Sequence, residues 1–287
     1  MTDTQIKLTE CPRDAMQGIV HFIPTELKAA YLNLLLQVGF DTIDFGSFVS
    51  PKAIPQMQDT AEVLKRLDIT STKSKLLAII ANYRGAEDAA QYEEISYLGY
   101  PFSISETFQL RNANTTISHA FNTVKQIKQL CGTKNKELVV YLSMGFGNPY
   151  GDEWNVEIVQ QWSERLINEG INIIALSDTV GVATPKQISD IYPALCNIFP
   201  GTDFGLHLHA TPDKWQDKIA AAYKAGCRRF DSALKGYGGC PMASDELTGN
   251  IATENLIGYL EFQNEHLGLN MDKFRKALEY SGRVFNV

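Results

Sequence analysis

The chain has 287 residues, of which 44% are hydrophobic and 21% are charged, an ordinary globular composition with enough length for a large core. Its formal net charge of -7 argues against nucleic acid as a partner, because binding phosphates requires a basic surface. The N-terminus has no basic-then-apolar signal pattern, and no apolar run approaches the roughly 20 residues of a membrane span. We therefore expect a cytoplasmic protein that binds neither membrane nor nucleic acid, although a small anionic ligand remains compatible with this charge.

The cysteines do not form a disulfide framework in this interpretation. Their number is odd, no C-x-x-C motif is present, and they are scattered at Cys11, Cys131, Cys196, Cys227 and Cys240. This spacing indicates reduced thiols in a reducing compartment.

In chain order, short apolar runs alternate with longer amphipathic stretches. The runs are typical of buried strands, and the stretches repeat apolar residues with helical spacing. Predicted strands span residues 6–10, 42–45, 75–80, 94–98, 138–142, 171–176, 203–206 and 229–234. Predicted helices span residues 27–38, 118–130, 156–168, 185–199, 215–225 and 255–266.

This alternation predicts parallel strands, and about eight units favour a closed (β/α)8 TIM barrel forming one domain over residues 1–287. No G-x-G-x-x-G or Walker motif follows the first predicted strand, which argues against an open nucleotide-binding sheet. Such a barrel carries its active site at the C-terminal ends of its strands.

His207-Leu208-His209 is the clearest chemical pattern. Side chains two apart on a strand share a face, so both imidazoles can point at one metal ion. The alternative is that the two histidines are hydrogen-bonded polar residues at a strand end.

Arg13 and Asp14 directly follow the first predicted strand. An arginine beside a hard oxygen ligand suits a metal enzyme that stabilises a developing oxyanion. For this pair alone, a surface salt bridge is the alternative. Together with the histidines, however, the barrel brings several polar residues to one end, and this convergence predicts a divalent-metal site. These residues are Arg13, Asp14, Asp44, Ser47, Asp178, Thr179, His207, His209, Cys240 and Asn250.

At these residues the sequence resembles the 3-hydroxy-3-methylglutaryl-CoA lyases, a family of the DRE-TIM metallolyase superfamily. The resemblance covers nearly the whole chain. It is carried by the motifs C-P-R-D-A-M-Q at 11–17, S-F-V-S-P-K at 47–52 with I-P-Q-M at 54–57, L-S-D-T-V-G-V-A-T-P at 176–185, G-G-C-P at 238–241 and G-N-I-A-T-E at 249–254.

The resemblance implies a metal site of Asp14, His207, His209 and Asn250, holding Mg²⁺ or Mn²⁺. It further implies that Arg13 stabilises an enolate and that Cys240, on a glycine-rich mobile loop, acts as acid or base. The remaining implied roles are catalytic for Asp44, which stands where the family has Glu, for Asp178 in proton transfer and for His207, and substrate-binding for Arg13, Gln17, Ser47 and Thr179.

The chain departs from the family pattern near the substrate. Ala15 replaces a glycine, Ala210 replaces an aspartate, Asn148 replaces a cysteine, and the loop at 242–247 is one residue longer and has no glycine. These changes touch the substrate pocket and the loop but remove neither a metal ligand nor the thiol.

The expected activity is metal-dependent cleavage of 3-hydroxy-3-methylglutaryl-CoA to acetyl-CoA and acetoacetate, with an acyl-CoA thioester as substrate and a homo-oligomer, dimer or larger, as the assembly. Three alternatives remain. The first is a related lyase or aldolase acting on another hydroxyacyl thioester or hydroxy-oxo acid. The second is a synthase, although the C-terminal regulatory regions of such synthases are missing from this sequence. The third is a metal-binding barrel without activity.

Overall fold

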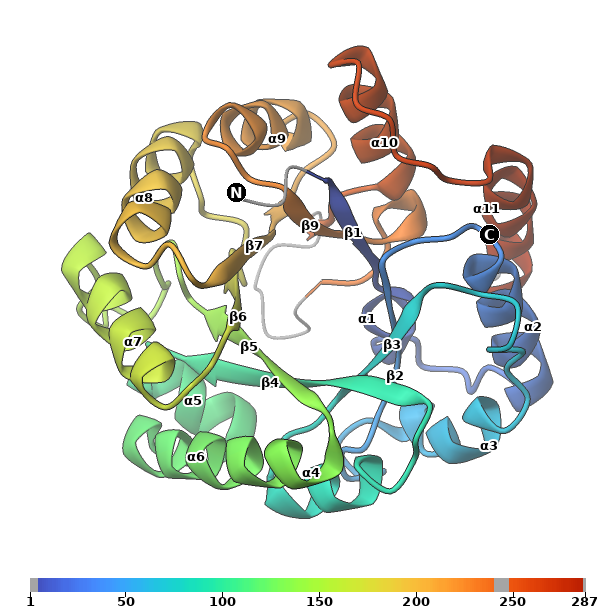
Figure 1. Cartoon of the computed structure of the whole chain (residues 1–287), viewed down its shortest axis with the longest axis horizontal. Coiled ribbons are helices and arrows are strands. Elements are labelled where there is room, and N and C mark those ends of the chain that lie inside the picture. The colour runs from blue at the N-terminus through green and yellow to red at the C-terminus, as the bar shows by residue number, and fades with distance from the viewer. Residues whose placement is uncertain (1–4, 240–247, 286–287) are drawn as a thin grey trace.

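The centre of the molecule is a closed barrel of parallel strands, shown from one end in Figure 1. The computed structural model describes residues 5–239 and 248–285. Each barrel strand pairs with the next one along the chain, and the last pairs with the first, so the predicted (β/α)8 fold is confirmed. In order the strands are β1 (Lys7–Glu10), β2 (Thr42–Ser47), β3 (Lys75–Ile79), β4 (Ile95–Ser103), β5 (Glu137–Ser143), β6 (Ile173–Ser177), β7 (Asp203–His207) and β9 (Arg229–Ser232).

Helices surround the barrel (Figure 1). The predicted helices are confirmed, with ends shifted by a few residues, as α2 (Thr25–Leu36), α6 (Ile117–Lys134), α7 (Val156–Asn168), α8 (Pro185–Ile198), α9 (Trp215–Lys224) and α10 (Thr253–Phe262). The sequence did not predict α1 (Pro12–Gln17), α3 (Thr60–Leu64), α4 (Tyr83–Ala89), α5 (Glu106–Ala113), α11 (Met271–Phe285) or the 3₁₀ turns η1 (Pro55–Met57) and η2 (Leu234–Gly236).

Local sequence explains where several helices begin. Thr184 and Gln187 form a capping box at the start of α8, with Pro185 in its first turn. Ser105 caps α5 by accepting a hydrogen bond from the backbone N–H of Phe108 at 3.1 Å. The short helices that were missed span one or two turns, too few for a helical repeat to stand out in the sequence.

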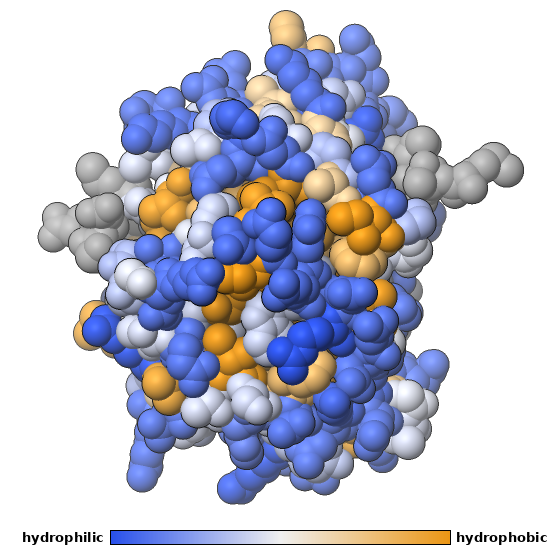
Figure 2. All heavy atoms as spheres, turned by 90° about the vertical axis from the view of Figure 1, so that its left-hand side faces the viewer, coloured by the Kyte–Doolittle hydropathy of each residue, from blue (hydrophilic) through white to orange (hydrophobic). Residues whose placement is uncertain are grey.

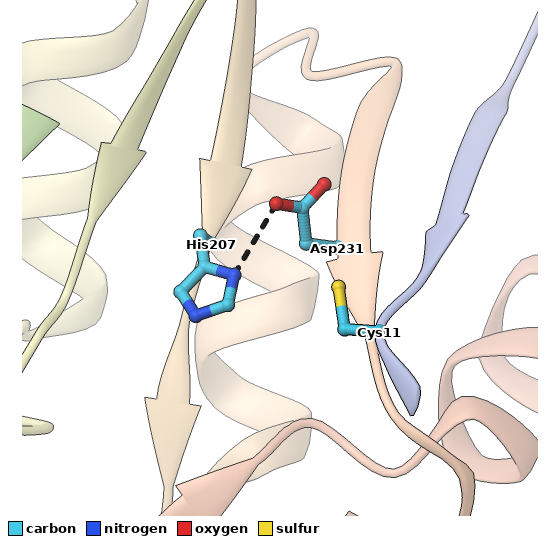
Figure 3. A group of neighbouring side chains, drawn as sticks. All are labelled: Cys11, His207 and Asp231. Carbon is cyan, nitrogen blue, oxygen red and sulfur yellow. Dashed lines mark hydrogen bonds and ion pairs between the residues drawn. The ribbon is translucent and has the colours of Figure 1, made fainter. Parts of the chain in front are cut away.

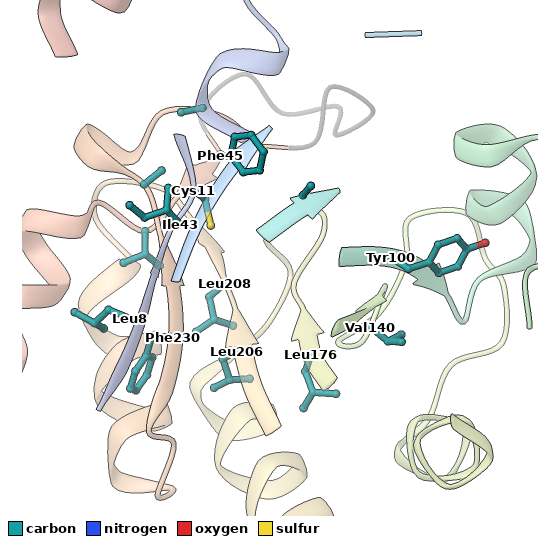
Figure 4. Packing of buried hydrophobic residues seen from close by; sticks show 14 of the residues in the cluster. Leu8, Cys11, Ile43, Phe45, Tyr100, Val140, Leu176, Leu206, Leu208 and Phe230 are labelled. Atoms are coloured by element: carbon teal, nitrogen blue, oxygen red, sulfur yellow. The ribbon is translucent and has the colours of Figure 1, made fainter. Parts of the chain in front are cut away.

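The strands separate two buried clusters. Side chains on their outer faces pack against the helices, as Leu8, Val140, Leu176 and Leu206 show in Figure 4. The inner faces fill the barrel with Leu77, Ile79, Tyr97, Val139, Tyr141, Ile173 and Ala175. Because neighbouring positions of a strand face opposite ways, the nearly continuous apolar runs of the sequence serve both clusters.

The segment after β1 differs from the expectation. Strand pairing ends after Cys11, as expected. The Cys11 N–H makes the last hydrogen bond, to the Ser232 carbonyl at 2.9 Å, because Pro12 has no N–H to donate. Pro12 then occupies the first turn of α1, a position in which a helix tolerates proline. Arg13 and Asp14 therefore lie in this helix and not in an open strand end.

A second correction concerns His207 and His209, which were expected on one strand. β7 ends at His207, and His209 begins the separate strand β8 (His209–Ala210). β8 pairs antiparallel with β10 (Gly249–Asn250), where His209 is the register partner of Asn250. This small ribbon brings the segment after the last barrel strand back to the histidines.

Figure 2 shows the side of the molecule that lies at the left of Figure 1, where α7 and α8 cover the barrel. Hydrophilic side chains dominate this face, and hydrophobic ones reach it in several separate patches. Within residues 5–239 and 248–285, no helix combines the length and apolarity that crossing a membrane requires. The four cysteines of this part, Cys11, Cys131, Cys196 and Cys227, are free thiols.

Candidate active site

A cavity of about 370 Å³ opens beyond the C-terminal ends of the barrel strands. Its wall contains most of the site residues expected from the sequence, together with an apolar side that includes Val49, Ile54 and Phe108. The expected residues that line it are Arg13, Asp14, Gln17, Asp44, Thr179, His207 and His209. Asn250 does not line it but is hydrogen-bonded to Asp14.

The two histidines face one another with defined tautomers. Nδ1 of His207 lies 3.2 Å from a carboxylate oxygen of Asp231, and Nδ1 of His209 lies 3.1 Å from the carbonyl oxygen of Thr179. Both partners present an acceptor oxygen, so each Nδ1 carries a proton. Burial alone would lower the pKa of His207, but its hydrogen bond to Asp231 and the charges of Asp231 and Asp14 raise it. The two Nε2 atoms are 3.2 Å apart. Two acceptors at this distance repel one another unless a cation or a proton lies between them.

Asp14 completes a group of ligand atoms with the two histidines. One ligand atom from each of Asp14, His207 and His209 lies within 4.8 Å of the other two. Burial alone would raise the pKa of Asp14, but the charge of Arg13 and the hydrogen bond from Asn250 lower it, so the carboxyl is ionised. Burial also lowers the pKa of His209 to about 4, which keeps that imidazole neutral.

Asn250 supplies an amide to the same place. Its Nδ2 donates to Asp14 at 2.6 Å and to the Tyr237 carbonyl at 2.8 Å. With both amide protons engaged, the side-chain oxygen is the atom of Asn250 able to bind a cation. Two imidazoles, one carboxylate and one amide oxygen suit a divalent ion of the Mg²⁺ or Mn²⁺ kind, and neighbouring ligands of such an ion lie about 3 Å apart. The residues present therefore fit a divalent cation.

A second group with metal-ligand spacing contains Cys11, His207 and Asp231 (Figure 3). Burial and the charge of Asp231 raise the pKa of the Cys11 thiol well above its usual range, so this sulfur stays protonated. Asp231 is bonded to Nδ1 of His207, the nitrogen that faces away from His209. This arrangement is typical of a carboxylate that orients a metal-binding imidazole from behind, which favours the Asp14 group as the metal site.

Arg13 lies beside this group in a network of charge-assisted hydrogen bonds. Its Nε and Nη2 donate to Asp44 Oδ2 at 3.0 and 2.6 Å. Its Nη1 donates to Asp14 at 3.2 Å and to Gln17 at 2.8 Å. The charges of Asp44 and Asp14 outweigh burial and raise the pKa of the guanidinium, which is permanently charged. Asp44 and Gln17 thus hold the Arg13 guanidinium next to Asp14.

Besides Asn250, two more of the expected residues do not line the cavity. Asp178 is 1% exposed and accepts hydrogen bonds from Lys218 Nζ at 2.6 Å and from the Ala183 N–H at 2.9 Å. Lys218 also donates to the His209 carbonyl at 2.7 Å, so this lysine links Asp178 to His209 by hydrogen bonds. Ser47 is buried, and its Oγ has no hydrogen-bond partner among the described residues. Cys240 lies outside the described residues.

Gly238, two residues before Cys240, packs directly on the candidate metal site. Gly238 has φ +89°, and a Cβ at this position would lie 2.7 Å from the Asp14 carbonyl oxygen and 2.8 Å from Asn250 Nδ2. A side chain here would both strain the backbone and displace these two residues.

Glu10 forms a separate buried network at the end of β1. Its Oε1 accepts from the Leu234 N–H at 2.9 Å, and its Oε2 lies 2.5 Å from Thr253 Oγ1, which is 2.9 Å from Ser232 Oγ. Burial raises the pKa of Glu10 to about 8. The hydrogen bonds from Thr253 and from the Leu234 N–H favour the ionised form, but burial outweighs them.

Sequence reasoning missed Asp231, Lys218, Glu10 and Arg111. Asp231 and Glu10 lie inside strands, where aspartate and glutamate are uncommon, and this was the available signal. Lys218 lies on α9 and is 3% exposed, which its position in an amphipathic helix did not reveal. Arg111 lines the cavity from α5, a helix that was not predicted.

The chain is similar to known proteins over nearly its whole length. The family model described as HMGL-like matches residues 5–280. Hydroxymethylglutaryl-CoA lyase YngG of Bacillus subtilis is 33% identical over 269 residues, 94% of this chain and 89% of that protein. The mitochondrial hydroxymethylglutaryl-CoA lyase of Mus musculus is 31% identical, covering 98% and 86%.

A solved structure extends the similarity to three dimensions. The HMG-CoA lyase from Acinetobacter baumannii, in complex with coenzyme A and 3-methylmalate, has a TM-score of 0.90 and 30% identity over 100% of this chain and 93% of that one. The resemblance seen in the sequence motifs is thereby confirmed. With a family model over nearly its whole length and relatives above 30% identity, the chain belongs to the HMGL-like family.

Proposed function

We propose that this protein is a carbon–carbon lyase that cleaves 3-hydroxy-3-methylglutaryl-CoA into acetyl-CoA and acetoacetate. The observation that carries this proposal is the placement of Arg13, with its fixed charge, directly beside the ligand group of Asp14, His207 and His209 in one cavity. The lyases similar to this chain give the substrate. Residues 1–287 are proposed to form one catalytic domain.

Asp14, His207, His209 and Asn250 would hold a divalent cation, Mg²⁺ or Mn²⁺. A cation bound there supplies Lewis acidity that makes the tertiary hydroxyl of the substrate easier to deprotonate. This chemistry needs ligands that stay in place, and His207 and His209 are each fixed through Nδ1 by Asp231 and the Thr179 carbonyl.

Arg13 would stabilise the negative charge that develops on the thioester oxygen. Loss of the hydroxyl proton turns the C–O bond into a ketone, the bond between C2 and C3 breaks, and its electron pair becomes the enolate of the acetyl thioester. Asp44 orients the Arg13 guanidinium through two nitrogens, so the donor is in position before charge appears.

Cys240 would then deliver a proton to the enolate carbon and give acetyl-CoA. His207 and Asp178 are also proposed to take part in proton transfer, Asp178 through Lys218. Gln17, Ser47 and Thr179 are proposed to contact the substrate. A cytoplasmic location and a homo-oligomer, dimer or larger, belong to this proposal as well.

The test is acetoacetate release by the purified protein supplied with Mg²⁺ or Mn²⁺. The assay panel contains 3-hydroxy-3-methylglutaryl-CoA and other 3-hydroxyacyl-CoA thioesters. The reason is that Ala15 and Ala210, which stand where the family pattern has a glycine and an aspartate, are buried beside the site. Turnover that prefers 3-hydroxy-3-methylglutaryl-CoA and stops with chelator supports the proposal. Preference for another thioester would identify a related lyase, and no turnover of any thioester would contradict the proposed activity.

A further inference from the structure

The cavity wall carries two permanently charged cations among its described residues, and they differ in what they contact. Arg13 is occupied by Asp44, Asp14 and Gln17. Arg111 is exposed and has no carboxylate of the described residues within ion-pair distance. Hydrogen bonds from Ser105 and Thr107 lower the pKa of Asp152 and the charge of Arg111 lowers it further, but Asp152 and Arg111 form no ion pair.

Arg111 is nevertheless held in place. Its guanidinium lies over the ring of Tyr150, 4.7 Å from the centroid. Tyr150 in turn stacks on Phe108, with centroids 6.3 Å apart and an interplanar angle of 21°. Phe108, Arg111 and Asn112 recur at i, i+3 and i+4 on α5, so they share the face of the helix that lines the cavity. Stacking of this kind leaves the N–H groups of arginine free to bind an anion.

We propose that Arg111 binds the free carboxylate of the acyl group and thereby sets the preference for a dicarboxylic acyl thioester. This inference rests on the proposed function and names the part of the substrate that one residue recognises. The acyl carboxylate is a short carbon chain away from the reacting atoms, whereas the phosphates of CoA are separated from them by the long pantetheine arm. Arg111 lines the same cavity as the metal ligands, which favours the carboxylate. The planar guanidinium can bind it through two parallel hydrogen bonds.

The test compares two substrates that differ only in this carboxylate. 3-Hydroxy-3-methylbutyryl-CoA has the same tertiary hydroxyl and thioester, and its cleavage gives acetyl-CoA and acetone. Arg111→Gln should lower kcat/KM for 3-hydroxy-3-methylglutaryl-CoA by about 10- to 100-fold, the loss expected for a charged hydrogen-bond partner. For 3-hydroxy-3-methylbutyryl-CoA, which lacks the acyl carboxylate, kcat/KM should change less than about twofold. Arg111→Lys keeps the charge, so its kcat/KM for 3-hydroxy-3-methylglutaryl-CoA should lie between those of wild type and Arg111→Gln. An equal loss on both substrates, or no loss on either, would overturn the proposal.

Two further measurements show whether a loss of kcat/KM in Arg111→Gln has another cause. With the pantetheine thioester of the same acyl group, which has no nucleotide, the loss in Arg111→Gln should persist; if it disappears, Arg111 binds a CoA phosphate instead. Arg165→Gln is the matched control, because Arg165 is also exposed and stacked on an aromatic ring, 4.0 Å from the Trp162 centroid, but lies on α7 outside the cavity. This variant should behave as wild type.

A binding measurement keeps the inference independent of turnover. 3-Methylglutaryl-CoA and 3-methylbutyryl-CoA lack the hydroxyl and cannot be cleaved. Calorimetry should show that wild type binds the dicarboxylic thioester more tightly and that Arg111→Gln loses this difference. If wild type cleaves no substrate yet shows this difference, the proposed function fails while the role of Arg111 stands. If wild type cleaves 3-hydroxy-3-methylglutaryl-CoA but Arg111→Gln keeps the binding difference, the role of Arg111 fails alone.

Discussion

His207 contacts Asp231 through Nδ1 at 3.2 Å, and this contact turns its other nitrogen toward His209. The carboxylate holds both the orientation and the tautomer of the imidazole, and in the proposed metal site it would act on metal binding without touching the metal.

Asp231→Asn should therefore weaken metal binding by about 10- to 100-fold, because an amide can present its NH₂ to Nδ1 and favour the wrong tautomer. Calorimetric titration with Mn²⁺ and Mg²⁺ measures this. Asp203→Asn is the control, since Asp203 also pairs with cations, Lys7 and Arg229, but at the start of β7. Equal metal affinity in Asp231→Asn and wild type would show that Asp231 is structural.

Arg13→Lys should reduce kcat by about 10²- to 10³-fold, the typical loss for one oxyanion donor. Lysine keeps the charge but cannot contact Asp44 through two nitrogens while reaching Asp14 and Gln17. Steady-state kinetics on 3-hydroxy-3-methylglutaryl-CoA checks this, with Arg165→Lys as the control. Near-normal turnover in Arg13→Lys would show that the network only stabilises the fold.

Gly238→Ala should lower both metal affinity and turnover, because the new methyl group would push against Asp14 and Asn250 and the positive φ disfavours alanine. Gly132→Ala in α6 is the matched control, since a Cβ there meets no atom within 4 Å. If Gly238→Ala binds metal as wild type does, the contact between this glycine and the ligands is not tight in solution.

Cys240→Ser should leave metal affinity unchanged and nearly abolish turnover, because a hydroxyl is a much weaker acid than a thiol. Thiol alkylation, with the modified cysteine mapped by mass spectrometry, gives a second readout. Cys11, Cys131 and Cys227 are buried, and we expect their alkylation to be slow. If Cys240→Ser retains activity, a group other than Cys240 delivers the proton.

Glu10 predicts a pH dependence of stability. Its pKa is about 8 in the folded chain against a usual 4.5, so the folded state binds the proton more tightly. The stability that this group contributes is fully present below pH 4.5 and is lost as the pH rises to about 8, a change on the order of 4 kcal/mol.

Glu10→Gln mimics the protonated acid and should remove this dependence. Its free energy of unfolding, measured with urea between pH 5 and 8, should exceed that of wild type by an amount that grows with pH. Glu164→Gln, on the exposed face of α7, should show a constant difference. A constant difference for Glu10→Gln would mean that Glu10 is ionised in the folded protein.

Much of this site could be predicted because strand–helix alternation fixes which residues meet. Arg13 follows β1, Asp44 lies within β2 and His207 ends β7, and closure of the barrel brings them to one cavity. The sequence could not show which residues hold the histidines in place without lining the cavity. Asp231 and Lys218 contact the site through His207 and through the His209 carbonyl, and such contacts depend on the packing of strands and helices, not on spacing in the chain.

Other predictions failed for local reasons. His207 and His209 do converge, but through a break between β7 and β8 that the H-x-H pattern does not encode. The last helix, α11, was not predicted although Phe274, Ala277, Ser281 and Val284 are buried at helical spacing.

The pairing of His209 with Asn250, and the hydrogen bond from Asn250 to Asp14 across 236 positions, give the site an order of assembly. Asp14 belongs to the first helix of the chain, whereas Asn250 follows every strand of the barrel. During synthesis the first of the proposed ligands is therefore made long before its partner, and the full set of proposed ligands can exist only after the barrel has closed. Tight metal binding would thus report the completion of folding, and a chain arrested before the β8–β10 ribbon would be recognised by its failure to bind the ion as the finished protein does.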